Sequence, residues 1–153
     1  MTAKPVRLQL GRRKGFDLQA WSREVNGLPA VRVSRPGRFG NPFTVADARE
    51  TGWRGDDRAL AARCVGAFRV WADSPHWREN WQGPESEQAR AALLAELPAL
   101  RGKNLACWCG VISRGTYSPC HADVLLSLAN GIPLEEVINE NIRRAEGQEV
   151  QRG

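Results

Sequence analysis

The spacing of apolar residues predicts four helices, mostly in the second half of the chain. In the first of these helices the apolar positions recur at intervals of four, four and three residues, namely Leu60, Cys64, Phe68 and Trp71. This helix is expected to begin after Asp56 or Asp57 and to end at Ser74-Pro75. Further helices are predicted over 87–97, over 118–129 with Ser118 as its N-cap, and over 134–145. Cys64 lies on the apolar face, so we expect a buried core thiol.

Short extended runs predict strands at 7–10, 30–34 and 103–109. The second run ends at a segment with two glycines and two prolines, 35–43, which is incompatible with regular structure. The third run leads into a loop at Cys107-Trp108-Cys109. Residues 16–26 and 44–54 have no clear period.

Strands that alternate with helices predict an α/β fold, here a small three-layer, Rossmann-like arrangement with a mostly parallel sheet flanked by helices. We expect a single domain over 1–146 and a flexible tail over 147–153. In open parallel sheets, sites form beyond the carboxyl ends of the strands. The glycine-rich turn and the cysteine-rich loop each follow a predicted strand, so the two are expected to share one site.

Composition supports a globular, cytoplasmic protein. The chain has 153 residues, of which 42% are hydrophobic and 25% charged. No apolar run reaches the roughly 18 residues of a membrane span, and the N-terminus lacks the apolar core of a signal peptide. No membrane association is therefore expected. In a reducing cytoplasm, clustered cysteines favour metal binding or catalysis over disulfides.

Positive charge is concentrated in the first half of the chain. Residues 1–70 carry 14 Lys and Arg against 6 Asp and Glu, whereas residues 71–153 carry 8 against 11. This imbalance favours a polyanionic partner, a nucleotide or a nucleic acid. An arginine-rich, solvated surface without a partner is the alternative.

Three cysteines and a histidine follow the third predicted strand in the pattern C-x-C-x10-C-H. Alternation along a strand places Cys107 and Cys109 on one face, with α-carbons about 6.6 Å apart. We expect a metal, mainly zinc, held by three or four ligands from Cys107, Cys109, Cys120 and His121. The main alternative is a catalytic Cys120 thiolate, activated at a helix N-terminus, with His121 as its base. An iron–sulfur cluster and merely packed cysteines are the remaining possibilities.

The turn after the second strand is the second candidate for chemistry. Gly37 and Gly40 flank an arginine, and Asn41-Pro42 follows directly. Such a turn can present backbone N–H groups and arginines to phosphate, so Arg35, Arg38 and Asn41 are candidate phosphate or sugar ligands. The alternative is a rigid turn that packs its phenylalanines inward. A further basic turn at 12–14 is a possible anion contact.

Three sequence blocks together carry a family resemblance: Arg35 to Phe43, Leu100 to Cys109, and Pro119 to Leu125. Over roughly residues 10–130 the chain resembles the domain-of-unknown-function family numbered 4326, whose members are small proteins common in phages and bacteria. Phe39 stands where tryptophan is common, and the insert from Gly110 to Ser118 is longer than in the family pattern. The resemblance implies no reaction, but it implies that the turn and the cluster occur together.

From the chain alone we therefore expect an enzyme that acts on a nucleotide, a nucleoside or a nucleic-acid base. Its composite site would combine the turn that contains Arg38 with the Cys/His cluster. The alternative is a non-catalytic nucleic-acid-binding module with structural zinc, driven by the basic first half of the chain.

Overall fold

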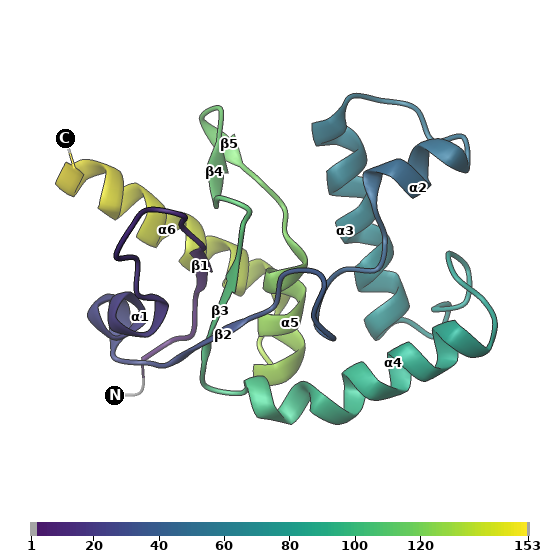
Figure 1. Cartoon of the computed structure of the whole chain (residues 1–153), viewed down its shortest axis with the longest axis horizontal. Coiled ribbons are helices and arrows are strands. Elements are labelled where there is room, and N and C mark those ends of the chain that lie inside the picture. The colour runs from purple at the N-terminus through teal and green to yellow at the C-terminus, as the bar shows by residue number, and fades with distance from the viewer. Residues whose placement is uncertain (1–2, 153) are drawn as a thin grey trace.

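A three-stranded parallel sheet lies at the centre of the protein (Figure 1). The computed structural model describes residues 3–152, and the side chains of residues 3–147. The strands are β1 (Arg7–Gln9), β2 (Ala30–Arg32) and β3 (Asn104–Cys107), and β3 lies between the other two. Leu8 is opposite Ala106, and Val31 is opposite Leu105. The predicted small α/β fold with a parallel sheet is confirmed.

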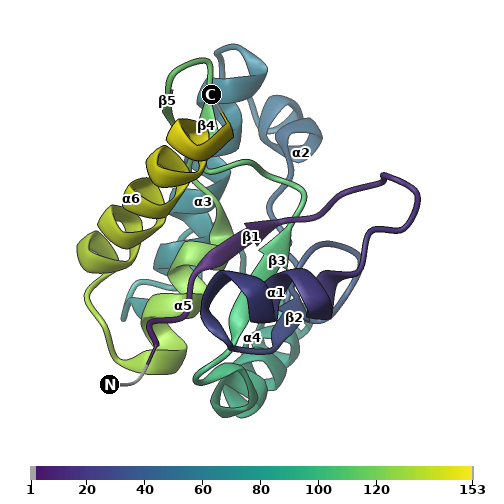
Figure 2. The ribbon, with the colours of Figure 1, turned by 90° about the vertical axis from the view of Figure 1, so that its left-hand side faces the viewer.

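Helices cover both faces of this sheet. Helix α1 (Leu18–Asn26) lies on one face, and α5 (His121–Asn130) lies on the other (Figure 2). Alternation along the strands divides the core accordingly, with Ala106 facing α1 and its neighbours Leu105 and Cys107 facing α5. The α1 side of the core is formed by Val6, Leu8, Leu10, Ala30 and Ala106, with Phe16, Leu18, Trp21 and Val25 packed against them.

A group of helices extends from the α5 side of the sheet (Figure 1). It contains α2 (Val45–Glu50), α3 (Asp57–Asp73), α4 (Pro84–Glu96) and the 3-10 turn η1 (Leu97–Leu100). Helix α3 has the predicted bounds, because the Asp56 side chain accepts from the Ala59 amide and Ser74 ends the helix. Cys64 is buried on its apolar face, as expected.

Two helices lie where none was predicted. The Asp17 side chain caps α1 by accepting from the Ala20 amide, and Gly27 ends it in the left-handed conformation, with φ 81°. Its apolar residues Leu18, Trp21 and Val25 recur at three and four residues and pack on the core, a helical period that was missed. Thr44 caps α2 through the Asp47 amide, and with six residues α2 is too short to display a repeated apolar face.

The start of α5 differs from the prediction. The helix begins at His121, and its N-cap is Cys120 rather than Ser118. The reason is a hairpin formed by β4 (Ile112–Ser113) and β5 (Thr116–Tyr117), in which the Ser118 amide donates to the Val111 carbonyl at 2.7 Å. Ser118 therefore closes the hairpin. Gly131 ends α5 as the sequence indicates, with φ 64°.

The last helix, α6, runs from Leu134 to Arg152, beyond the expected end at Ala145. The flexibility expected over 147–153 stays a prediction, and Gly153 lies outside the described residues. Among the described helices, none is both long and apolar enough to cross a membrane.

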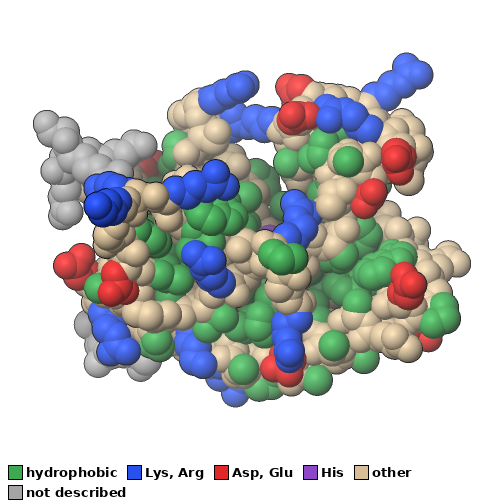
Figure 3. All heavy atoms as spheres, viewed as in Figure 1, with side chains coloured by type: hydrophobic (Ala, Val, Ile, Leu, Met, Phe, Trp, Pro, Cys, Tyr) green, Lys and Arg blue, Asp and Glu red, His purple; other side chains and the backbone are tan. Residues whose placement is uncertain are grey.

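On the face shown in Figure 3, Lys and Arg side chains cross the middle, and acidic side chains lie mainly toward the edges.

A buried ion pair joins the first strand to the helix that covers it. Arg7 of β1 donates to the Asp123 carboxylate of α5 at 3.1 Å, and the two side chains are 0% and 1% exposed. Asp123 also accepts from Tyr117 and, at 2.7 Å, from the Asn141 amide. The Asn141 Oδ1 atom in turn accepts from the backbone amide of Arg7 at 2.8 Å. One network therefore connects β1, the hairpin, α5 and α6.

Replacing Asp123 by Asn is expected to lower the free energy of unfolding by about 3–5 kcal/mol, because the Arg7 charge would stay buried without a counterion. Urea denaturation measures this change. The matched control is Glu87→Gln, which breaks the exposed Arg78–Glu87 pair and should cost less than about 1 kcal/mol. Equal effects of the two substitutions would contradict a structural role for the buried pair.

Candidate functional site

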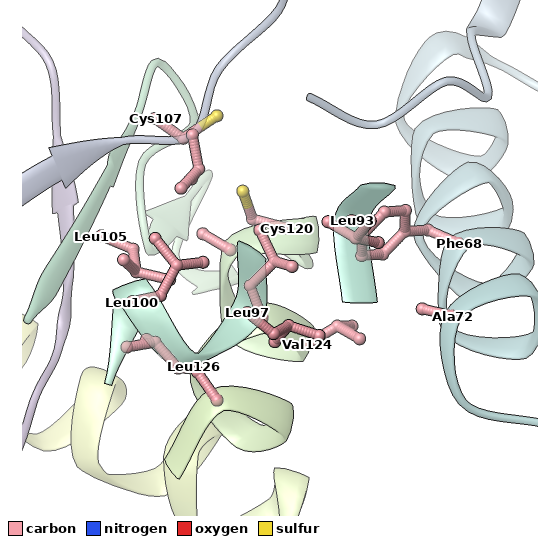
Figure 4. Close-up of a cluster of buried hydrophobic side chains, with 14 of the residues drawn as sticks. Phe68, Ala72, Leu93, Leu97, Leu100, Leu105, Cys107, Cys120, Val124 and Leu126 are labelled. Carbon is pink, nitrogen blue, oxygen red and sulfur yellow. The ribbon is translucent and has the colours of Figure 1, made fainter. Parts of the chain in front are cut away.

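The thiols of Cys107, Cys109 and Cys120 meet between the end of β3 and the start of α5. Their sulfur atoms all lie within 4.8 Å of one another, and the Cys107 and Cys109 sulfurs are 4.0 Å apart. Cys107 and Cys120 are buried, whereas Cys109 is exposed. Figure 4 shows the Cys107 and Cys120 sulfurs directed into the same space above the apolar core. Three free thiols in this arrangement can hold a metal ion.

The position of Cys120 outside the helix explains this convergence. As the N-cap, Cys120 has extended backbone angles, φ −147° and ψ 143°, so its side chain is not restricted to the helical first turn. The sequence prediction placed Cys120 and His121 together in that turn, about 100° apart around the helix axis. Because the N-cap lies two residues later than predicted, Cys120 is free to approach the two cysteines at the end of the strand, whereas His121 belongs to the first turn of the helix.

His121 lies beside the three thiols but outside the group of mutually close ligand atoms. Its Nε2 atom is 2.7 Å from the Val33 carbonyl oxygen, and its Nδ1 atom is 3.7 Å from the Cys120 sulfur. Because a carbonyl only accepts, Nε2 carries the proton and Nδ1 presents a lone pair toward Cys120. Burial lowers the pKa of His121, which favours this neutral form. Its roles as a fourth ligand or as a base stay predictions.

Hydrogen bonds among the thiols shift the pKa values of the three cysteines in different directions. The bonds with Cys109 and Cys120 lower the pKa of Cys107 far below that of an ordinary thiol. The same bonds raise the pKa of Cys109 and of Cys120, and burial raises both further. The alternative of a catalytic Cys120 thiolate requires the helix N-terminus to lower the pKa of Cys120. The pKa of Cys120 is instead raised, first by the hydrogen bonds with Cys107 and Cys109 and then by burial.

A pocket of about 200 Å³ separates the thiols from the turn after β2. It brings together two of the three predicted phosphate ligands, Arg35 and Asn41, with the three cysteines and His121. Arg35 is the positively charged residue among the described residues that line this pocket. The complete lining is Ser34, Arg35, Asn41, Phe43, Val45, Ala61, Cys64, Val65, Cys107, Trp108, Cys109, Pro119, Cys120 and His121.

The three polar residues of the turn have different positions. Asn41 is buried and holds the turn in place, since its side chain donates to the Cys64 carbonyl at 3.2 Å and accepts from the Phe43 amide at 2.9 Å. Arg35 donates one nitrogen to the Asn41 and Phe43 carbonyls, at 2.8 and 3.2 Å. Arg38 lies outside the pocket lining, in an exposed pair with Glu96. Its predicted phosphate role remains untested.

Close backbone approach in this turn depends on Gly40. A β-carbon at this position would lie 2.9 Å from both the α-carbon and the Cγ atom of Arg35. Any larger residue would therefore displace Arg35. Glycine at this position lets the turn fold back over the first residue of the segment, and that fold directs the Arg35 guanidinium toward the Asn41 and Phe43 carbonyls.

Sequence reasoning missed Arg7, which lies directly behind the thiols. Burial is the largest single effect and opposes the charged form of Arg7, but the negative charges of Asp123, Cys120, Tyr117 and Cys109 together outweigh it, so the pKa of Arg7 rises. A second Arg7 nitrogen donates to the Gly110 and Ser118 carbonyls, at 3.2 and 2.9 Å. The available signal was a charged residue between the apolar residues Val6 and Leu8 of a predicted strand.

A family model described as "Domain of unknown function (DUF4326)" matches residues 17–131. The chain belongs to this family. The matched region contains Arg35, Asn41, the three cysteines and His121 of the pocket. Arg7 and Asn141 lie outside the region that the DUF4326 model matches. Arg7 nevertheless binds the carbonyls of the segment between the cysteines, and Asn141 accepts from the Arg7 backbone amide. Comparison with curated proteins and with solved structures finds no match.

We expect this DUF4326 protein to bind one metal ion per chain through its three clustered thiols. Elemental analysis after purification without chelator, normalised to protein concentration, measures the stoichiometry. Cys107→Ser, Cys109→Ser and Cys120→Ser should each reduce it to near zero, because two remaining thiols hold a metal poorly. Cys64→Ala is the control, since Cys64 lines the pocket but lies outside the thiol group, and it should retain the metal. Absence of metal in both the wild type and this control would contradict the prediction.

Proposed function

We propose that the protein is an enzyme that acts on a nucleotide, a nucleoside or a nucleic-acid base, with zinc held by Cys107, Cys109 and Cys120. One observation carries the proposal: the three clustered cysteines and Arg35 line the same pocket. A metal-binding group and an anion-binding group that face the same small cavity suit a ligand with both a polar reacting group and a phosphate.

The donor set fits zinc. Thiolates are soft ligands, and Zn²⁺ in proteins prefers four-coordinate sites rich in sulfur and nitrogen. Three protein ligands leave one position for substrate or water, which is typical of catalytic rather than structural zinc. A zinc ion held here would supply Lewis acidity to a polar group of the ligand. If His121 were the fourth ligand, the site would be closed and structural, so ligand access to the metal distinguishes the two arrangements.

Residues of the chain itself would bind and orient the ligand. Arg35 has one nitrogen fixed by two backbone carbonyls, which holds its guanidinium in place for a phosphate at little entropic cost. The Nδ1 lone pair of His121 is oriented by the bond from Nε2 to Val33 and can accept a proton at the edge of the cluster. Phe43 and Val65 form apolar parts of the pocket wall and limit the access of water.

Cobalt substitution provides a test that does not require the reaction to be known. Co²⁺ bound to three thiolates absorbs in the visible range, and a group that enters the fourth position changes these bands. We expect nucleoside monophosphates of at least one base to change the spectrum of the cobalt-substituted protein at saturable concentrations. Arg35→Gln should weaken this binding by roughly 10- to 100-fold, the loss expected for a charged hydrogen bond.

The matched control is Arg38→Gln, which removes an arginine of the same turn whose side chain is 62% exposed and paired with Glu96. It should change the affinity by less than about twofold. A spectrum that no nucleotide, nucleoside or base alters would contradict the proposal and favour the closed, structural metal site. Equal losses in the two arginine variants would contradict the assignment of Arg35.

A further inference from the structure

We propose that Trp108, Arg12 and Arg32 form a binding surface for single-stranded nucleic acid at the mouth of the thiol pocket. This inference rests on the proposed function and makes it more specific, because the base that enters the pocket would then belong to a polynucleotide strand. The surface is formed by one exposed aromatic ring, two guanidinium groups that lie over this ring and the basic turn that begins at Arg12.

Trp108 connects the cluster to the surface. It lies between Cys107 and Cys109 in the bend that follows β3, and the guanidinium groups of Arg12 and Arg32 lie over its ring. The residue is 39% exposed, and among the described residues Leu94 is the other large apolar residue with a comparable exposed fraction. Trp108 also lines the thiol pocket, so a ligand on its ring would be adjacent to the pocket entrance.

Three strand ends bring the surface together. Arg12 follows β1, Arg32 is the last residue of β2, and Trp108 follows β3 directly. Because the strands are parallel, their carboxyl ends lie at one edge of the sheet, from which the loop between β1 and α1 extends (Figure 2). The Arg12 and Arg32 guanidinium carbons lie 4.8 and 6.0 Å from the centroid of the Trp108 ring system.

The positive charges of this surface have no acidic partners within the described part of the chain. Arg12, Arg13, Lys14 and Arg32 are exposed, and the described residues include no ion pair or side-chain hydrogen bond for any of them. Other exposed arginines, such as Arg78, pair with a carboxylate. The nearby acids Asp17 and Glu24 lie with Arg12 and Arg13 along a groove on the α1 side. A polyanion would therefore pass on the side of Arg32.

A single strand is the polyanion that fits these features. Proteins bind single strands by stacking bases on aromatic rings while cations contact the phosphates. A base paired in a duplex would have to leave its stack before it could enter a pocket of about 200 Å³. An acidic peptide would use the same cations but would gain little from a flat, exposed indole ring.

Fluorescence anisotropy with labelled 12-nucleotide single strands of DNA and RNA, at 50 and 200 mM salt, tests the surface. Trp108→Leu should weaken binding by roughly 5- to 150-fold, the range expected for loss of one stacked base. The control is Trp77→Leu, since Trp77 has Arg78 and Arg90 at 4.0 and 4.7 Å in a similar arrangement elsewhere on the protein. It should leave the affinity unchanged, and thermal melting checks that both variants are folded.

The double variant Arg12→Gln/Arg32→Gln should also lower the slope of log affinity against log salt by about 1.4, corresponding to two lost phosphate contacts. Arg78→Gln/Arg143→Gln removes the same charge from exposed sites elsewhere and should leave the slope unchanged. Equal losses in the two double variants, equal losses in the two tryptophan variants, or equally tight binding of duplex or of polyglutamate would overturn the inference.

The cobalt spectra separate this inference from the function proposed above. If mononucleotides change the cobalt bands while wild-type protein fails to bind oligonucleotides, the surface is wrong and the proposed function stands. If oligonucleotides bind through Trp108 while no nucleotide, nucleoside or base changes the bands, the surface is supported and the enzyme proposal fails. Failure of both measurements overturns both.

Discussion

A guanidinium and a carboxylate buried together are costly unless every remaining hydrogen-bonding group nearby is used to compensate them. Arg7 and Asp123 meet this condition in large part through four partners: Tyr117 of β5, Asn141 of α6, and the Gly110 and Ser118 carbonyls at the two ends of the hairpin segment. Among the described side chains, the Arg7 Nε atom is buried without a hydrogen-bond partner. Gly110 directly follows Cys109, and Ser118 is two residues before Cys120. Because Arg7 binds the carbonyls at both ends of this segment, it fixes the separation of Cys109 and Cys120.

The same guanidinium affects the charge of the cluster. Its positive charge lowers the pKa of Cys109 and of Cys120, whereas the stronger effects of thiol hydrogen bonds and burial raise both. The pKa of Cys107 is lowered, so Cys107 loses its proton more readily than Cys109 and Cys120, whose protons are held more strongly. A metal ion would replace these two protons, and the nearby positive charge of Arg7 would offset part of the added negative charge. The buried pair is thus connected to the site through both geometry and charge.

The features that the sequence predicts are those with local causes. The period of Leu60, Cys64 and Phe68 predicts α3, and the pattern of β-branched residues predicts β2. The Cys and His spacing identifies the cluster because its residues lie within fifteen positions. The Arg7–Asp123 pair spans 116 positions, so no local pattern reveals it. Likewise, Ser118 is a good N-cap residue by composition, but the hairpin uses its amide and transfers the cap to Cys120.

The single residue between Cys107 and Cys109 connects the cluster to the outer surface. In an extended chain, two residues separated by one position share a face, and the residue between them takes the opposite face. In this chain β3 ends at Cys107, and the bend at Trp108 and Cys109 keeps both sulfurs close to that of Cys120 at the start of α5. The ring of Trp108 lies at the edge of the sheet where Arg12 and Arg32 are found. The spacing that permits a three-thiol site thus also places an aromatic ring at the entrance to the pocket.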